Sequence, residues 1–194
     1  MIQTYVINRE SRKDRLTDIT EQLRLQGMNG HLFKAIEGGW KGCRDSHLAL
    51  LDKCKNEKMF LILEDDALFV EDINPYLDLA LEQLPKNWDL LMLGGSPQKP
   101  QKRYSDNLFT ARDVLTTHAL LWHPRFNGAA EWILSHKDFT TNMKWDDFLV
   151  EWIQSCYNCF LIAPMLITQR QTQSDIARRS DCSSIERNYN KYCK

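Results

Sequence analysis

Short apolar runs alternate with amphipathic segments along most of the chain. The runs are rich in β-branched, aromatic and leucine side chains, which predicts buried strands. Between them, apolar residues recur at three- and four-residue spacing, which is typical of helices packed on one face. The expected strands are 4–7, 31–35, 60–63, 88–93, 118–122 and 160–163, and the expected helices are 11–27, 43–55, 74–84, 124–134 and 146–155. Strands alternating with helices predict an α/β domain with a mainly parallel central sheet.

Some stretches give a weaker pattern. Residues 96–107 are polar with two prolines, and we expect a mobile loop there. Residues 108–117 are ambiguous between a pair of strands and a loop. The 194-residue length favours one core, so we expect a single domain over 1–176 followed by a polar C-terminal tail over 177–194.

Charge and hydropathy exclude some classes of protein. There are 25 Lys and Arg residues against 26 Asp and Glu, so no basic excess is available to neutralise nucleic-acid phosphates, and no nucleic-acid partner is expected. No apolar run approaches the ~20 residues that span a bilayer, and the N-terminus does not resemble a signal peptide. We therefore expect a cytoplasmic protein with at most peripheral membrane contact.

The cysteines and glycines give little further chemistry. Cys156 and Cys159 form one C-x-x-C pair, but a structural zinc site usually needs a second pair or closely spaced histidines, so none is expected here. The chain also lacks the glycine patterns of a P-loop or of a dinucleotide site.

Three consecutive carboxylates, Glu64, Asp65 and Asp66, follow the apolar run at 60–63. Adjacent negative charges at the end of a buried strand repel one another, so a cation usually offsets them. Mg²⁺ and Mn²⁺ prefer such oxygen ligands and complete their shells with water and substrate phosphates. The triplet therefore indicates a divalent-cation site, and the alternative is a solvated acidic turn.

Other polar side chains are placed to join this site. The first strand is followed by Asn8, Arg12 and Arg15, whose position predicts that they lie near the same sheet edge. Ser46 and His47 lie early in the second helix, where a lone histidine is more often structural. Two further carboxylates, Asp146 and Asp147, open a helix, and each is either a helix cap or a general base.

Taken in chain order, these segments form one pattern. It consists of Tyr5-Val6-Ile7-Asn8 with Arg12 and Arg15, Ala35-Ile36-Glu37-Gly38, Gly42-Cys43 with Ser46-His47, Leu63-Glu64-Asp65-Asp66, Trp88-Asp89 with Leu93-Gly94, Asp146-Asp147-Phe148-Leu149, and Pro164 with Gln169 and Ser174-Asp175-Ile176. The pattern resembles glycosyltransferase family 25, the galactosyltransferase-type family of lipooligosaccharide biosynthesis and collagen glycosylation. The resemblance implies a GT-A-like fold, a three-layer α/β/α sandwich that binds a nucleotide-diphospho-sugar.

The resemblance also implies a reaction. A hexose, galactose or glucose, would pass from a UDP-sugar to a hydroxyl of a glycan or glycoconjugate acceptor with inversion, and Mn²⁺ or Mg²⁺ would be required. The resemblance implies that Asp66 and Glu64 bind the metal, and that Glu64 and Asp65 contact the ribose or water of the second coordination shell. It implies nucleotide contacts for Asn8, Arg12 and Arg15, and donor contacts for Ser46, His47, Gln169 and Ser174. Asp146, or else Asp147, would be the base.

Two other functions remain open from the residues alone. The same carboxylates would serve a Mg²⁺-dependent phosphoesterase or nucleotidyltransferase. The six tryptophans would serve a non-catalytic glycan-binding module that keeps the transferase fold, although aromatic residues at helical spacing are more often core.

Overall fold

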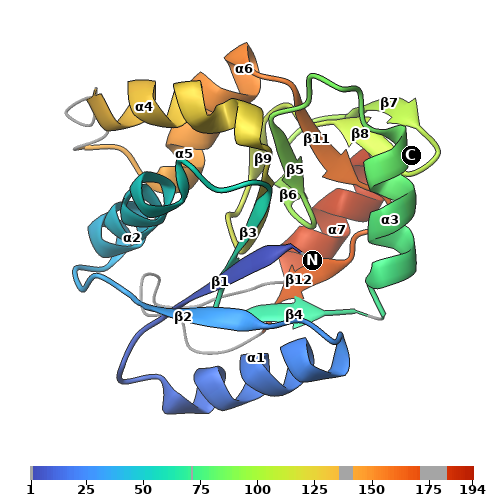
Figure 1. The fold of residues 1–194 in the computed structure, drawn as a ribbon. Coiled ribbons are helices and arrows are strands. Elements are labelled where there is room, and N and C mark those ends of the chain that lie inside the picture. The colour runs from blue at the N-terminus through green and yellow to red at the C-terminus, as the bar shows by residue number, and fades with distance from the viewer. Residues whose placement is uncertain (1, 71, 136–141, 171–182) are drawn as a thin grey trace.

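The computed structural model describes residues 2–70, 72–135, 142–170 and 183–194 (Figure 1). Its strands are β1 (Gln3–Asn8), β2 (Gly30–Lys34), β3 (Phe60–Glu64), β4 (Ala67–Phe69), β5 (Leu90–Met92), β6 (Ser96–Pro97), β7 (Lys102–Ser105), β8 (Leu108–Thr110), β9 (Val114–Leu115), β10 (Ala119–Trp122), β11 (Cys159–Ile162) and β12 (Ile167–Gln169). Eight of them form the central sheet in the order β2-β1-β3-β10-β5-β11-β8-β7. The pairs β12–β4 and β6–β9 form two small sheets beside it.

The helices cover both faces of the central sheet (Figure 1). They are α1 (Lys13–Leu25), α2 (Trp40–Cys54), α3 (Asn74–Gln83), α4 (Asn127–Ser135), α5 (Trp145–Phe148), α6 (Gln154–Cys156) and α7 (Ser183–Tyr192). Residues of α1 and α3 pack in one apolar cluster, and residues of α2, α4 and α5 pack in the other. This three-layer α/β/α arrangement confirms the predicted fold class.

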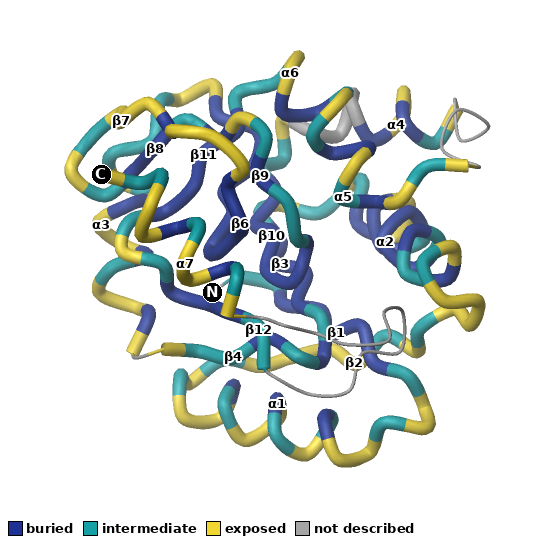
Figure 2. Tube along the Cα trace, turned by 180° about the vertical axis from the view of Figure 1, so that it is seen from behind, coloured by how far each residue is buried: buried dark blue, intermediate teal, exposed yellow. Residues whose placement is uncertain are grey.

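Strand β3 shows why a continuous apolar run predicts a central strand. Phe60 and Ile62 point into the cluster with α2, whereas Leu61 and Leu63 point into the cluster with α1, because successive side chains of a strand alternate between faces. All four are buried, and Figure 2 shows the central strands as the buried part of the chain.

The sheet is mixed rather than uniformly parallel. Strand β1 pairs in parallel with β2 and β3, and β5 pairs in parallel with β11, while the other four pairings are antiparallel. Strand β10 lies between β3 and β5 and runs against both. The parallel register sets Ile7 opposite Glu64, so the residues that follow β1 and β3 emerge at the same edge.

Some local expectations were wrong. The first helix does not begin at residue 11: α1 begins at Lys13, and Arg12 is in the N-cap position without a side-chain cap. Residues 96–107 contain β6 and β7 instead of a mobile loop, because the buried Gln101 side chain donates hydrogen bonds to the carbonyls of Lys99 and Arg112. Strand β7 forms one edge of the central sheet and β2 forms the other, so β7 lies away from the end of β1.

The segment expected to be a polar tail contains an amphipathic helix. Ile185 and Tyr189 of α7 are buried, and the Tyr189 hydroxyl donates a 2.6 Å hydrogen bond to the Ile162 carbonyl oxygen at the end of β11. The Asn188 amide also reaches the Ser96 hydroxyl at 3.1 Å. Residues 183–192 therefore pack onto the domain. Among the described residues, no helix has the length and hydrophobicity needed to cross a bilayer.

Candidate functional site

A pocket opens beyond the carboxyl ends of β1 and β3, where ligands bind in open α/β sheets. The acidic triplet and Arg15 line it from one side. The loop after β2, residues 35–39, and Cys43 in the first turn of α2 line the other side, and Arg9 completes the wall. The structure thus brings the predicted triplet and one of the predicted cations into a single pocket.

Asp65 is the anchored member of the triplet. Its Oδ2 accepts a 2.8 Å hydrogen bond from the Asn8 side-chain amide, and its Oδ1 accepts a 2.8 Å bond from the Arg15 guanidinium. Asn8, Arg15 and Asp65 are all buried. Both oxygens of Asp65 therefore accept hydrogen bonds from protein donors, and these bonds fix the turn after β3 at the wall of the pocket.

Asp66 is less well compensated. Its side chain is 19% exposed, and its neighbours are Arg15 at 3.3 Å and the Gln169 amide at 3.5 Å. Burial raises the pKa of Asp66 to about 7, and repulsion from Glu64 adds to this rise, while Arg15 opposes it. A carboxylate whose charge is unfavourable in the protein alone suits a position beside a cation.

Glu64 is held at the end of β3 by two other elements. Its Oε1 accepts a 2.6 Å hydrogen bond from the Thr117 hydroxyl and lies 3.2 Å from His47 Nε2. Burial alone would raise the pKa of Glu64. The hydrogen bond and the electrostatic attraction of His47 outweigh burial, together with the hydrogen bond from Thr117, and they hold the pKa of Glu64 below its ordinary value.

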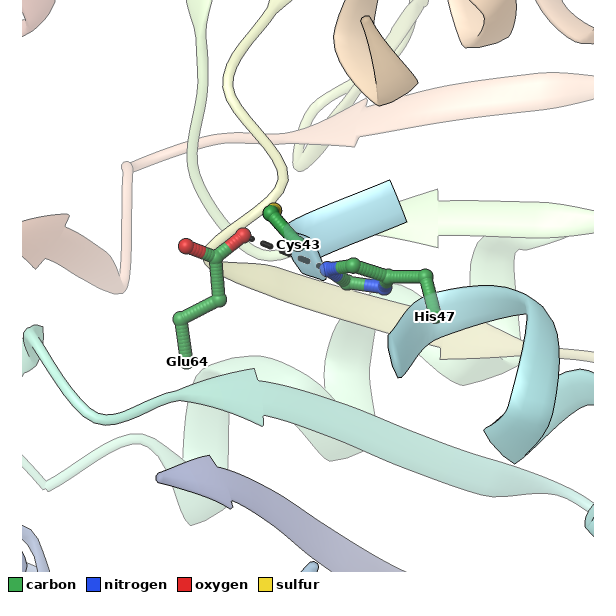
Figure 3. Close-up of side chains that lie close together, drawn as sticks. All are labelled: Cys43, His47 and Glu64. Atoms are coloured by element: carbon green, nitrogen blue, oxygen red, sulfur yellow. Dashed lines mark hydrogen bonds and ion pairs between the residues drawn. The ribbon is translucent and has the colours of Figure 1, made fainter. Parts of the chain in front are cut away.

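His47 and Cys43 lie on the same face of α2, because residues four apart in a helix are neighbours. His47 is fully buried, and its ring stacks on Trp145 with centroids 5.5 Å apart. Figure 3 shows Cys43, His47 and Glu64 converging, and their ligand atoms all lie within 4.8 Å of one another. Burial, followed by the charges of Glu64, Asp146 and Asp66, raises the pKa of the Cys43 thiol well above its ordinary value.

Two residues that were predicted to contact the donor do not line the pocket. The buried Ser46 hydroxyl accepts a 2.8 Å bond from the Ile36 amide and donates a 2.7 Å bond to the Gly42 carbonyl, so it positions the wall formed by residues 35–39. Arg12 pairs with Asp14 at 2.9 Å and is not among the residues that line the pocket.

The two candidate bases differ in environment. Asp146 is half-buried, and burial, with the charge of Asp147 second, raises its pKa. Asp147 is exposed. The neighbouring Trp145 stacks on His47, and the charge of Asp146 acts on Cys43, so the start of α5 lies near these two residues of α2, although Asp146 does not line the pocket. Ser174 lies outside the described residues.

Arg9, which is one of the cations that follow the first strand, lines the pocket and forms a 2.6 Å ion pair with Glu37. Sequence reasoning missed two residues of the site, Thr117 and Cys43, which were not singled out as contacts. The spacing of Cys43 and His47 by four residues is a ligand pattern that was available in the sequence, whereas nothing local links Thr117 to Glu64.

Part of the chain is similar to a known family. The model of glycosyltransferase family 25 (LPS biosynthesis protein) matches residues 38–112. Over this segment the chain is similar to family 25 glycosyltransferases. The matched segment includes Cys43, Ser46 and His47 of α2 and the acidic triplet, so the resemblance inferred from the motifs is confirmed.

Solved structures are similar to this chain in fold. A glycosyltransferase involved in glycosylation of the major capsid of PBCV-1 matches with a TM-score of 0.57 at 10% identity, over 83% of this chain and 81% of that one. The protein A197 from STIV matches with a TM-score of 0.54 at 9% identity, over 89% and 87%. A putative glucose-1-phosphate thymidylyltransferase from Bacillus anthracis, in complex with a sucrose, matches with a TM-score of 0.50 at 12% identity, over 85% and 69%. At these identities the likeness concerns the fold alone. No curated protein sequence matches the chain.

Proposed function

We propose that this glycosyltransferase moves a hexose, galactose or glucose, from a UDP-sugar to a hydroxyl of a glycan or glycoconjugate acceptor, with inversion and with a divalent cation. One observation carries the proposal: Arg15, Glu64 and Asp66 meet in one pocket at the carboxyl ends of β1 and β3, and two of them lie in the segment that matches the family.

The residues present fit a hard divalent cation such as Mn²⁺ or Mg²⁺. Glu64 and Asp66 offer carboxylate oxygens to the same pocket, and the raised pKa of Asp66 shows that its negative charge lacks full compensation within the protein. Bound there, the ion would neutralise the charge that develops on the diphosphate of the leaving UDP.

The protein's own groups would position the donor. Asn8 and Arg15 hold Asp65, and this fixes the turn that presents Asp66. Arg9, on the pocket wall and paired with Glu37, brings a positive charge to the pocket in which the anionic donor would bind. Ser46 keeps Ile36 in place, so the wall opposite the triplet is set before the donor binds. Gln169 reaches Asp66 from the end of β12.

Asp146 is the proposed base. As the bond between the anomeric carbon and UDP breaks, the acceptor oxygen forms a bond to the opposite face of that carbon and gives its proton to a carboxylate. Burial raises the pKa of Asp146, which makes it a better proton acceptor than a fully solvated aspartate. Its half-buried position near Cys43 favours it over the exposed Asp147.

Calorimetric binding of UDP with and without Mn²⁺ tests the donor site. We expect Asp66→Ala to remove the metal-dependent part of the binding, because the variant lacks one of the two carboxylates that are proposed to hold the metal. Asp52→Ala is the matched control, since Asp52 lies on the exposed face of α2 and pairs with Lys55. Unchanged Mn²⁺-dependent binding in Asp66→Ala would show that the metal is held elsewhere.

Transfer activity tests the base separately. Asp146→Asn should abolish sugar transfer and leave UDP binding as in the wild type, because the amide keeps the shape but accepts no proton. Asp147→Asn should retain transfer. The reverse result would assign the base to Asp147.

The fold by itself also suits a nucleotidyltransferase, since the similar structures include a putative thymidylyltransferase. The two reactions release different products. A transferase of sugars releases UDP only when an acceptor or water takes the sugar, whereas a nucleotidyltransferase releases pyrophosphate from a nucleoside triphosphate. A glycan-binding module would bind sugars without metal or UDP. A cytoplasmic location stays a prediction.

A further inference from the structure

The proposed donor site uses carboxylate oxygens, but the pocket also has a sulfur and a nitrogen ligand that this role leaves unused. Cys43 lines the pocket, and His47 lies one helical turn further along α2. With Glu64 they bring Sγ, an imidazole nitrogen and a carboxylate oxygen within 4.8 Å of one another (Figure 3). Among the residues that the structure describes, this is the one group of three side chains with metal-ligand chemistry at such spacing.

The spacing fits a small tetrahedral cation. Two ligands on a tetrahedral Zn²⁺, with bonds of about 2.0 to 2.3 Å, lie roughly 3.3 to 3.7 Å apart. His47 Nε2 and Glu64 Oε1 are already 3.2 Å apart, and all three ligand atoms are within 4.8 Å. For a tetrahedral shell, the remaining pairs of ligand atoms would have to approach one another by about 1.5 Å at most.

The ligands are also supported by their surroundings. Thr117 donates a 2.6 Å hydrogen bond to Glu64, and Trp145 stacks on the His47 ring, so both side chains are oriented by other elements. His47 Nδ1 has no hydrogen-bond partner in the described structure. Nothing there prevents Nδ1 from carrying the imidazole proton while Nε2 binds a cation.

We propose that Cys43, His47 and Glu64 form a site for a borderline divalent cation of the Zn²⁺ type. The thiol separates this site from the hard-cation site formed by Glu64 and Asp66, because thiolate and imidazole prefer Zn²⁺ or Co²⁺ to Mg²⁺. On binding, the Sγ–H bond breaks, the sulfur binds the cation as a thiolate and the proton leaves to solvent; no electron is transferred.

The site has three protein ligands, which leaves a fourth position for water or substrate, as in catalytic zinc centres. Cys43 and Glu64 both line the pocket, while His47 approaches from the buried side, so the fourth position opens toward the pocket. The two sites share Glu64, and a Zn²⁺-type ion would therefore compete with the cation of the donor site for that carboxylate.

A Co²⁺ titration of the reduced, metal-free full chain tests the site without UDP or sugar. The expected result is saturation at one equivalent, with the visible bands of tetrahedral Co²⁺ and a thiolate-to-cobalt charge-transfer band in the near ultraviolet. One equivalent of Zn²⁺ should then remove these bands. Because no donor is present, failure here leaves the proposed transfer reaction intact, and failure of transfer leaves this site intact.

Matched variants identify the ligands. Cys43→Ser should lose the charge-transfer band, whereas Cys156→Ser, which changes the exposed cysteine of α6, should keep it. Glu64→Gln should keep the band and bind Co²⁺ at least tenfold more weakly, and this variant decides the question if circular dichroism shows that Cys43→Ser does not fold. Asp66→Asn should bind Co²⁺ like the wild type. Absence of saturable binding in the wild type, a band that persists in folded Cys43→Ser, or wild-type affinity in Glu64→Gln would overturn the proposal.

Discussion

At the residue scale, a small number of buried side chains hold the Asp65 carboxylate. The Arg15 guanidinium is 2.8 Å from Asp65 and 3.3 Å from Asp66, and its side chain is only 7% exposed. Breaking a buried ion pair by removing one partner leaves an uncompensated charge, which typically costs about 3 to 5 kcal/mol. The triplet therefore keeps its shape only while Arg15 is present.

Arg15→Met should accordingly lower the free energy of unfolding by about 3 kcal/mol or more. Urea denaturation followed by tryptophan fluorescence measures this change. Arg24→Met is the control, because Arg24 forms an exposed pair with Glu21 on the same helix, and such pairs contribute little. Equal midpoints for Arg15→Met and the wild type would mean that solvent, not Arg15, compensates the triplet.

His118 gives a pH dependence at the same scale. Its ring is fully buried beside the Ile167 carbonyl, and burial lowers its pKa below the ordinary value near 6.5. Below that pH the unfolded chain binds a proton that the folded chain does not, so the contribution of neutral His118 to stability is present above pH 6.5 and is lost as the pH falls.

The unfolding free energy of the wild type should therefore fall relative to that of His118→Gln as the pH decreases from 6.5, by up to about 1.4 kcal/mol per pH unit. Taking the difference between the two proteins removes the contribution of groups such as Asp66 that titrate in both. His31→Gln, on the edge strand β2, is the control. Parallel pH profiles for the wild type and His118→Gln would contradict this account.

At the scale of elements, the sequence predicted those with strong periodicity. The continuous apolar run 60–63 predicted β3, and the spacing of Ile19 and Leu23 predicted the buried face of α1. It did not predict α7, because its two buried residues, Ile185 and Tyr189, stand among charged and polar neighbours. The short antiparallel strand β7 was missed, and β8 lies in the stretch 108–117 that the sequence left open, because pairing across the sheet, and not local pattern, decides both strands.

Helix α7 leads to a prediction about the extent of the domain. A chain that ends at residue 176 would lose the burial of Ile185 and Tyr189, each contributing roughly 1.5 to 3 kcal/mol. It should unfold at least about 6 °C lower than the full chain in a thermal scan. Glu186→Ala, on the exposed side of α7, should leave the midpoint near that of the wild type. An unchanged midpoint for the shortened chain would support the domain boundary expected from the sequence.

At the scale of the whole molecule, the strand order assembles the pocket. Insertion of β10 beside β3 brings Thr117 to Glu64, and the parallel pairing of β1 with β3 brings Asn8 and Arg15 to Asp65. The sequence predicted the triplet and the cations after β1 because each lies next to a clear strand. It could not predict the cluster of Cys43 with Glu64 or the supporting role of Ser46, since both depend on how α2 packs against β3.

Release of UDP from a panel of UDP-sugars tests whether this pocket is a metal-dependent donor site. The wild type should release UDP from UDP-galactose or UDP-glucose only with Mn²⁺ or Mg²⁺ present, and Asp66→Ala should reduce this release at least about a hundredfold while Asp52→Ala should not. Release that is independent of divalent cations, or equal release by Asp66→Ala and the wild type, would contradict the assignment of this pocket as the donor site.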